Sequence, residues 1–442
     1  MTANTTNAQE QQAALEFSRE MLQFIEGSPT PFHAVANASG LLQSAGYSVP
    51  APDEDLAEGG RYLFSHNDSS LVAVSLNAPL EQGFSLVGAH TDSPCLKIKP
   101  NAAYLKDSCL QLGVEVYGGA LLSPWFDRDL SIAGRLTLTG RSGKLSNRLI
   151  DFLRPVGVIP SLAIHLNREA NDGNPINRQN HLPPLLDITE AEVDFQTLLL
   201  EQVKQQYPQE TYDSVLAFEL ALYDTQPPAI VGLRQNLLAS ARLDNLLSSY
   251  TGLRALLQQH QRGNCVLVLS DHEEIGSATA SGAAGPFLES VLRRLCGDEA
   301  RYRRAIDRSM LVSADNAHAL HPNYADRHEP KHKPLLNAGP VIKINHNQRY
   351  ATNSETQAVF AQICAQEGVP CQSFVVRSDM GCGSTIGPIT ATELGIRTVD
   401  VGAPQLAMHS IRETAGVLDS HYLLRALTAF YNRVERGVDR VS

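Results

Sequence analysis

The chain lacks the features that direct proteins to membranes, to secretion or to nucleic acid. It has no apolar stretch long enough to span a bilayer, and its first twelve residues, MTANTTNAQEQQ, lack the basic-plus-apolar pattern of a signal peptide. The formal net charge is −11 and no Lys/Arg cluster occurs, which argues against a nucleic-acid partner. We therefore expect a cytoplasmic protein that binds no membrane and no nucleic acid.

Patterned cysteines and several well-known catalytic motifs are also absent. The seven cysteines are an odd number without a C-x-x-C pair, and Cys265 lies within an apolar run. This predicts reduced thiols, not a disulfide framework or a cysteine-ligated zinc. There is no P-loop, no G-x-S-x-G elbow and no Rossmann fingerprint after the first strand, so those three chemistries have no support.

With 442 residues, the chain is long enough for two domains. Between residues 100 and 235, apolar residues alternate with polar ones as in half-exposed strands, for example at Leu110, Leu112 and Val114. Two more strand pieces are predicted within residues 154–167, and one helix near residues 195–207. On both sides of this region, apolar strand patterns alternate with helical ones.

This pattern predicts an α/β fold with an insertion. We expect a catalytic domain of residues 1–99 and 236–442, with a mixed, mostly parallel sheet flanked by helices. The inserted domain, residues 100–235, is expected to be β-rich and barrel-like.

Acids and histidines follow several apolar runs that are typical of buried strands. Glu273 and Glu274 lie just beyond the run NCVLVLS, His90 follows FSLVGA, and Asp315 follows MLVSA. Adjacent carboxylates at the end of a buried strand repel each other and are costly to desolvate unless a cation lies beside them. The carboxyl ends of parallel strands meet at one edge of a sheet. The sequence therefore predicts a hydrolase that binds two divalent metals.

Three further residues belong to this prediction. Asp92 lies two residues beyond His90, where it can accept the second ring N–H of that histidine. Asp244, in RLDN, has two oxygens with which to bridge two cations, and His409 follows the apolar run that ends near residue 402. Taken singly, His-x-Asp is more often an ordinary strand end, and a lone Asp in this position is more often a helix cap.

Glu273 and Glu274 are the most informative pair. One is expected to bind metal while the other serves as general base. The alternative is a solvated surface pair, which the preceding VLVL run makes unfavourable. In the loop after Asp315, His318 and His321 compete for a ligand role.

The sequence HEPKH at residues 328–332 matches the H-E-x-x-H pattern of zinc proteases. That pattern binds zinc only on a helix, where its two histidines share a face. Pro330 lies inside it and Pro334 follows, so a continuous helix is not expected. We interpret this match as fortuitous.

Six segments together resemble the aspartyl aminopeptidase family of dinuclear zinc exopeptidases. They are GAHTDSPCLKIKP, ARLDNL, DHEEIGS, SADNAHA, PVIKIN and APQLAMHSIRE. They occur in the family's order and span nearly the whole chain, insertion included. The loop from Arg377 to Pro388 also resembles the family's Gly-rich wall.

The resemblance implies specific roles for the candidate residues. His90 and Asp315 would bind one metal, Glu274 and His409 the other, and Asp244 both. Two divalent ions are implied, with zinc expected and cobalt or manganese as substitutes. Glu273 would be the base and Asp92 would orient His90.

The resemblance also implies a substrate and an assembly. Lys343 would recognise an acidic first residue of a peptide, although residue patterns alone favour an exposed strand lysine. His165, in the insertion, would reach a neighbouring subunit's active site, and the insertion would serve dimerisation. The expected partners are peptides with an N-terminal Asp or Glu and further copies of the chain, in a tetrahedral dodecamer.

Two other functions remain open at this level. A two-metal deacylase or carboxypeptidase would use the same ligands on a blocked or C-terminal substrate. A catalytically inactive assembly protein would keep the fold alone, although an intact Glu273 beside intact ligands argues against it.

Overall fold

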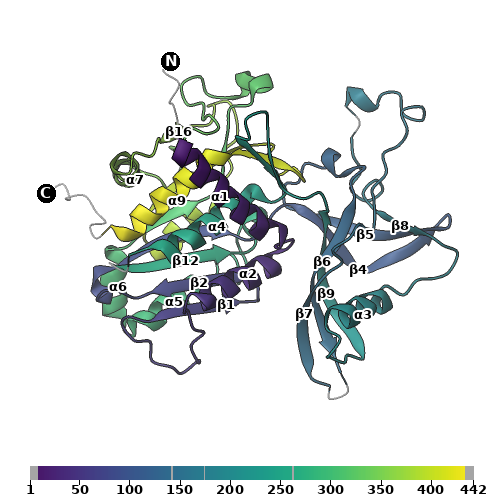
Figure 1. The fold of residues 1–442 in the computed structure, drawn as a ribbon, viewed down its shortest axis with the longest axis horizontal. Coiled ribbons are helices and arrows are strands. Elements are labelled where there is room, and N and C mark those ends of the chain that lie inside the picture. Colours follow the sequence, from purple (N-terminus) through teal and green to yellow (C-terminus); the bar gives the residue numbers. More distant parts are fainter. Residues whose placement is uncertain (1–7, 141–142, 174, 261–262, 434–442) are drawn as a thin grey trace. The chain divides into compact units, whose positions relative to one another are not determined.

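The structure is a computed structural model that describes residues 8–140, 143–173, 175–260 and 263–433 (Figure 1). The chain forms two compact units. The first comprises Met1–Asp92, Pro228–Met408 and Glu413–Ser442, and the second comprises Ser93–Pro227 with His409–Arg412. The first boundary precedes the expected one at 99/100 because strand β4 (Cys95–Lys106) already belongs to the sheet of the second unit.

An eight-stranded mixed sheet forms the centre of the first unit, as the predicted α/β class requires. Its order is β1-β2-β12-β3-β13-β17-β15-β16. Strands β12, β3, β13 and β17 run parallel in the middle, whereas the pairs β1–β2, β2–β12 and β15–β17 are antiparallel. The strands are β1 (Arg61–His66), β2 (Ser70–Ser75), β3 (Phe84–His90), β12 (Asn264–Ser270), β13 (Met310–Ala314), β15 (Val341–Lys343), β16 (Gln372–Phe374) and β17 (Arg397–Gly402).

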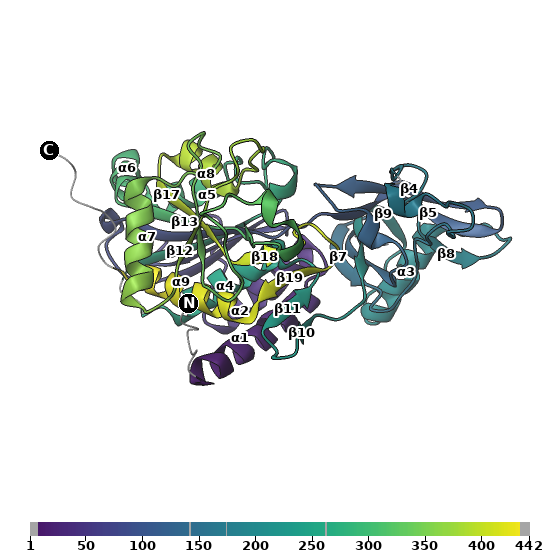
Figure 2. The ribbon, with the colours of Figure 1, turned by 90° about the horizontal axis from the view of Figure 1, so that it is seen from above.

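Every residue of β3, β12 and β13 is buried, because helices cover both faces of the sheet (Figure 1 and Figure 2). In β12, Leu267 and Leu269 pack toward one core, while Val266 and Val268 pack toward the other. The first core includes α1 (Ala8–Glu26), α2 (Pro31–Ser44), α4 (Leu243–Gln258), α7 (Ser354–Gln366) and α9 (Val417–Asn432). The second includes α5 (Phe287–Cys296), α6 (Glu299–Asp307) and the end of α8 (Ile386–Leu394).

A second, smaller sheet of the first unit joins the loops beyond the central strands. Its order is β10-β11-β19-β18-β14. The strands are β10 (Ala229–Val231), β11 (Leu237–Ser240), β14 (Ala317–His318), β18 (Pro404–Leu406) and β19 (Glu413–Gly416). The sequence does not predict this sheet, because strands of two to four residues are too short for a recognisable period. The sheet matters because β11 leads into Asp244 and β14 follows Asp315.

The second unit contains an antiparallel sheet of order β7-β6-β9-β4-β5-β8. Besides β4, these are β5 (Cys109–Tyr117), β6 (Leu130–Thr139), β7 (Leu145–Asp151), β8 (Leu185–Ile188) and β9 (Ser214–Asp224), with α3 (Phe195–Gln206) beside them. Isolated bridges join Gly157 to Leu130 of β6 and Val158 to Leu185 of β8. Two strand pieces were predicted within residues 154–167. In the structure, only the bridging residues Gly157 and Val158 of this range form β-structure.

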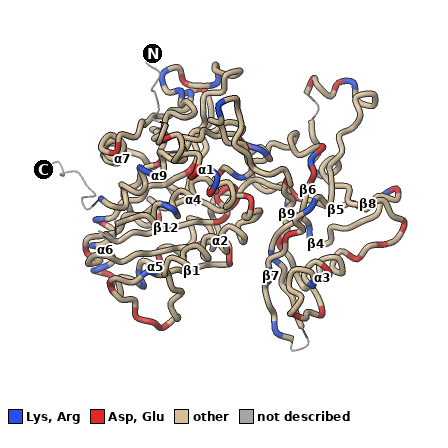
Figure 3. Tube along the Cα trace, viewed as in Figure 1, with Lys and Arg blue, Asp and Glu red and all other residues tan. Residues whose placement is uncertain are grey.

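None of the helices within the described ranges has the length and apolar character needed to cross a bilayer. Acidic and basic residues are interspersed along both units (Figure 3).

Candidate metal centre

His90, the last residue of β3, lies at the centre of the candidate site and is 1% exposed. Its Nε2 atom is 3.5 Å from Oδ1 of Asp244 and 3.5 Å from Oδ1 of Asp315. Asp315 directly follows β13, and Asp244 is the second residue of α4. The structure therefore places two carboxylates, from segments that are distant in sequence, beside the same imidazole nitrogen.

Asp244 is not placed by regular helix geometry. Although it lies within the bounds of α4, its φ and ψ are −85° and 104°, outside the helical region. Its backbone N–H donates to Oε2 of Glu413 at 2.9 Å. The next residue, Asn245, donates from Nδ2 to the carbonyl oxygen of Ala314 at 2.8 Å. These bonds fix the start of α4 beside the end of β13.

Asp92 contacts both His90 and the glutamate pair. The Nδ1 atom of His90 lies 3.1 Å from the carbonyl oxygen of Asp92 and 3.3 Å from its Oδ1. The backbone N–H groups of Glu273 and Glu274 donate to Oδ1 and Oδ2 of Asp92, each at 3.1 Å. The contact with His90 was expected. The hydrogen bonds from the backbone of Glu273 and Glu274 to Asp92 were not expected, because only the folded chain brings residue 92 beside residue 273.

Glu273 and Glu274 begin a short 3-10 helix, Glu273–Ile275, just beyond β12. Each offers a carboxylate oxygen within 4.8 Å of the other and of a ring nitrogen of His90. The same criterion groups His90 with Asp244 and Asp315. The pair is only partly exposed, so a freely solvated surface pair is not what the structure shows.

The crowding of acids shifts their ionisation. Burial and neighbouring carboxylates raise the pKa of Glu273 to about 8 and that of Glu274 well above its usual value. Burial lowers the pKa of His90, but contacts with Asp244, Asp315 and Asp92 outweigh it and raise that pKa well above normal. The cluster is thus strongly attractive to protons, and equally to a cation.

The surroundings of Lys343 differ from those that its local sequence indicates. It is 3% exposed in β15, not an exposed strand lysine. Its Nζ lies 3.1 Å from Oδ2 of Asp315 and 5.5 Å from the centre of the Tyr350 ring. Burial would raise the pKa of Asp315, but Lys343 and His90 outweigh it and hold that pKa below its usual range.

The donor set fits zinc. Imidazole nitrogen and carboxylate oxygen bind this ion at about 2.0–2.2 Å, so neighbouring ligand atoms in a tetrahedral site lie roughly 3.3–3.6 Å apart. The 3.5 Å separations between His90 Nε2 and the two carboxylates match that spacing and exceed ordinary hydrogen-bond lengths. His90, Asp244 and Asp315 are all buried, where uncompensated carboxylates are costly.

A family model described as "Aminopeptidase I zinc metalloprotease (M18)" matches residues 24–431, which covers every residue of this cluster. The chain belongs to the M18 family of zinc metallo-aminopeptidases. It is 57% identical over 422 residues to a protein named "Probable M18 family aminopeptidase 2" from Pseudomonas aeruginosa (strain LESB58), covering 94% of this chain and 98% of that protein. An identically named protein from Azotobacter vinelandii is 57% identical over 426 residues, with the same coverage.

Two solved structures share the fold. The structure titled as the Ape4 and Nbr1 complex matches with a TM-score of 0.92 and 36% identity, covering 96% of this chain and 87% of that one. The S. cerevisiae mApe1 dodecamer matches with a TM-score of 0.83 and 27% identity, covering 96% and 98%. The chain is therefore a metallo-aminopeptidase by family, with a mixed α/β fold.

Two expected site residues of this M18 chain, His409 and His165, belong to the second unit. His409 directly follows Met408 of the first unit, has a φ of 67°, and its Nδ1 lies 3.2 Å from the carbonyl oxygen of Gly119. His165 is exposed in a turn. Their roles remain predictions.

The competing histidines do not enter the cluster. Among the described residues, the groups able to hold a metal include neither His318 nor His321. His321 accepts a hydrogen bond from the Asn323 backbone and its ring lies 4.8 Å from that of Tyr324. Residues 328–332 form no α-helix, so the H-E-x-x-H match has no zincin geometry, as expected.

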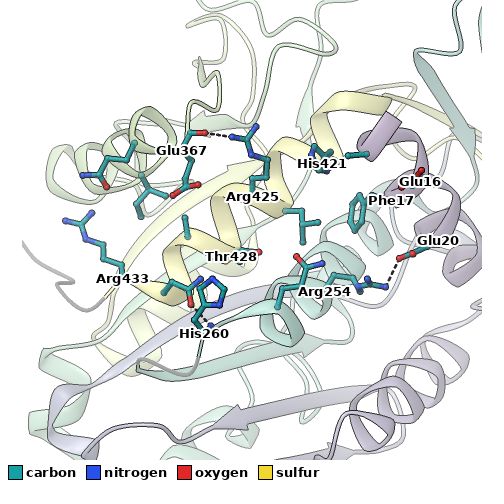
Figure 4. A pocket seen from close by; sticks show the side chains of 17 residues that line it. Glu16, Phe17, Glu20, Arg254, His260, Glu367, His421, Arg425, Thr428 and Arg433 are labelled. Carbon is teal, nitrogen blue, oxygen red and sulfur yellow. Dashed lines mark hydrogen bonds and ion pairs between the residues drawn. The ribbon is translucent and has the colours of Figure 1, made fainter. Parts of the chain in front are cut away.

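A cavity of about 650 Å³ lies elsewhere in the first unit, among α1, α4, α7 and α9 (Figure 4). Its charged side chains largely pair with the protein itself: Arg254 binds Glu20, and Arg425 donates to the carbonyl oxygen of Glu367. None of the candidate ligands lines it. The chemistry of the donors, not the size of a cavity, points to the candidate metal centre.

We expect zinc binding to the metal-free protein at pH 7 to release protons. Glu273, with a pKa of about 8, carries a proton at pH 7, and burial raises the pKa of Glu274 well above its usual value. A bound cation favours the ionised form of both side chains, so their protons are released. Calorimetric titration in buffers of different ionisation enthalpy measures the number released. That number should fall as the pH rises through 8, since Glu273 is then already ionised.

The matched control is Glu273→Gln, which should still bind zinc but release fewer protons at pH 7 than the unchanged protein. Equal proton release at pH 7 and pH 9 in the unchanged protein would contradict this account of the cluster.

Proposed function

We propose that this M18 chain is a dinuclear zinc aminopeptidase that releases N-terminal Asp or Glu from peptides. The observation that carries the proposal is the convergence of His90, Asp244, Asp315 and the Glu273–Glu274 pair at one edge of the sheet. That set contains enough carboxylates for two dications and leaves one over for proton transfer.

In this proposal, His90 and Asp315 would hold one zinc, Glu274 and His409 would hold the other, and Asp244 would hold both. This proposal is supported by the contact of Asp244 with His90. Asp244 also belongs, with His90 and Asp315, to a buried group that could hold a metal ion. When bound, the zinc pair supplies positive charge that polarises the scissile carbonyl and makes water a stronger acid.

Glu273 is the proposed general base. Its carboxylate takes the proton from the attacking water and delivers it to the nitrogen of the departing peptide. Asp92 supports this role, because it holds the backbone N–H of Glu273 while it contacts the ring of His90. The position of the base is thereby tied to that of a proposed ligand.

We expect Glu273→Gln to lower kcat/KM on an Asp-initiated peptide by about 10²–10⁴-fold, because the amide cannot accept a proton. Zinc content and the unfolding temperature should stay close to those of the unchanged protein, which separates a lost base from a lost site. Full activity in a zinc-loaded Glu273→Gln protein would remove Glu273 from the mechanism.

Lys343 is proposed to select acidic first residues. Three carboxylates against two zinc ions leave about one positive charge, and the buried ammonium of Lys343 adds another. This local positive charge attracts an acidic side chain despite the net charge of −11 on the chain. The ion pair with Asp315 fixes the ammonium close to the metal centre.

Lys343→Ala should lower kcat/KM far more for Asp- and Glu-initiated peptides than for Ala- or Leu-initiated ones. Zinc affinity must be measured in parallel, because the same change removes the partner of Asp315. N-acetylated acidic peptides serve as the control that separates an aminopeptidase from a deacylase. An unchanged ratio of acidic to neutral rates, at full zinc loading, would show that another group selects the substrate.

We further propose that the chain assembles into a homo-oligomer, by analogy with the mApe1 dodecamer, and that His165 completes the active site of a neighbouring subunit. The exposed turn that carries His165 supports this, since the segment is free to meet another molecule. The second unit would then serve the contacts between subunits.

This shared-site proposal predicts complementation. His165→Ala and Glu273→Gln homo-oligomers should each have low activity. When the two are dissociated, mixed and reassembled, activity should recover in part, because some sites then receive Glu273 from one subunit and His165 from another. Size measurement by light scattering confirms reassembly, and a mixture without recovered activity would argue that His165 acts within its own subunit or not at all.

A further inference from the structure

Two candidate ligands of the first unit are each followed by asparagine, in the segments Asp244-Asn245 and Asp315-Asn316. The asparagines make reciprocal hydrogen bonds. Asn245 donates from Nδ2 to the carbonyl oxygen of Ala314, the residue before Asp315, at 2.8 Å. Asn316 donates from Nδ2 to the carbonyl oxygen of Leu243, the residue before Asp244, also at 2.8 Å. Each asparagine thus binds the backbone beside the other aspartate.

A glutamine and a glutamate extend this arrangement. Asn316 Nδ2 also donates to Oε1 of Gln405 at 2.8 Å, and Gln405 Nε2 donates to Oε1 of Glu413 at 3.3 Å. The other oxygen of Glu413, Oε2, accepts the backbone N–H of Asp244 at 2.9 Å. The bonds therefore run from the residue after Asp315 back to Asp244 itself.

The network lies in the protein interior. Asn245, Asn316, Gln405 and Glu413 are each no more than 2% exposed. A broken hydrogen bond in such a place leaves a buried polar group without a partner, which is costly. Short strands supply the frame, since Gln405 lies in β18, Glu413 in β19, and Asn316 immediately before β14.

We propose that these four residues are positioning residues that fix the separation of Asp244 and Asp315 and thereby set the affinity of the centre for zinc. The inference rests on the proposed function in so far as these two aspartates bind metal. Because each asparagine bonds next to the opposite aspartate, neither segment can slide without breaking bonds on both sides. Outer groups of this kind typically change metal affinity 10–100-fold when they are replaced.

The pairing of Gln405 with Glu413 allows a sharp test by exchange. In Glu413→Gln, the two facing amides cannot satisfy Asp244 N–H, Asn316 and each other without one donor meeting a donor. In Gln405→Glu, two buried carboxylates face each other. In the double variant Gln405→Glu/Glu413→Gln, the new glutamate accepts from Asn316 and from the new glutamine, which in turn accepts the N–H of Asp244. The hydrogen bonds named above are then restored, with the bond between residues 405 and 413 reversed in direction and the total charge unchanged.

The experiment measures the zinc dissociation constant by competition with a chromogenic chelator, together with the unfolding temperature of the metal-free protein. We expect each single variant to bind zinc about 10–100-fold more weakly and the double variant to return to within a few-fold of the unchanged protein. The control for a general loss of stability is Asp419→Asn. Asp419 is also a buried carboxylate, but it accepts backbone N–H groups of Asn337 and Gly339. That variant should unfold at a lower temperature while its zinc affinity stays unchanged.

The outcomes are distinct. Single variants with unchanged zinc affinity, or a double variant as weak as the singles, overturn the positioning role. If the single variants do not fold, the double variant decides alone: near-normal zinc affinity supports the role, and failure to fold overturns it. Zinc binding to the unchanged protein is measured first. If that protein binds no zinc, the proposed metal centre itself is refuted.

Discussion

The concentration of buried carboxyl groups around one imidazole is the constraint on which the rest of the first unit depends. Asp92, Asp244, Glu273, Glu274 and Asp315 all lie around His90, and three of them are almost fully buried. Without a cation, part of this set must hold protons, as the raised pKa values of the glutamates show. The carboxyls that make metal binding favourable are therefore unfavourable for the metal-free protein.

The fold tolerates this cluster because apolar strands converge behind it. β3 lies between β12 and β13, and all three are parallel and fully buried. Their carboxyl ends deliver His90, the glutamate pair and Asp315 to one edge. Hydrogen bonds then fix the positions of these residues more closely. Asp92 binds the backbone of Glu273 and Glu274, and Glu413 binds that of Asp244. Packing brings the ligands together, and hydrogen bonds set their separations.

Much of this could be predicted from the sequence, since long apolar runs and paired acids leave strong signals. The class of fold, the central strands and the cluster around His90 follow from residues that stand at the ends of such runs. The small sheet did not, because its strands are too short to show a period. Glu413 and Gln405 were also missed: their importance comes from the pairing of β19 with β11 and β18, which no local pattern reveals. The burial of Lys343 likewise depends on its neighbours in space.

Sequence order along the main sheet has a consequence for biosynthesis. β3 emerges early from the ribosome, yet its two neighbours, β12 and β13, are translated only after residues Ser93–Pro227 of the second unit. The residues that surround His90 are consequently translated much later than His90 itself. Contacts between residues so far apart in sequence form slowly. The proposed zinc site is complete only once nearly the full chain has been made. Prematurely terminated products would therefore lack that site.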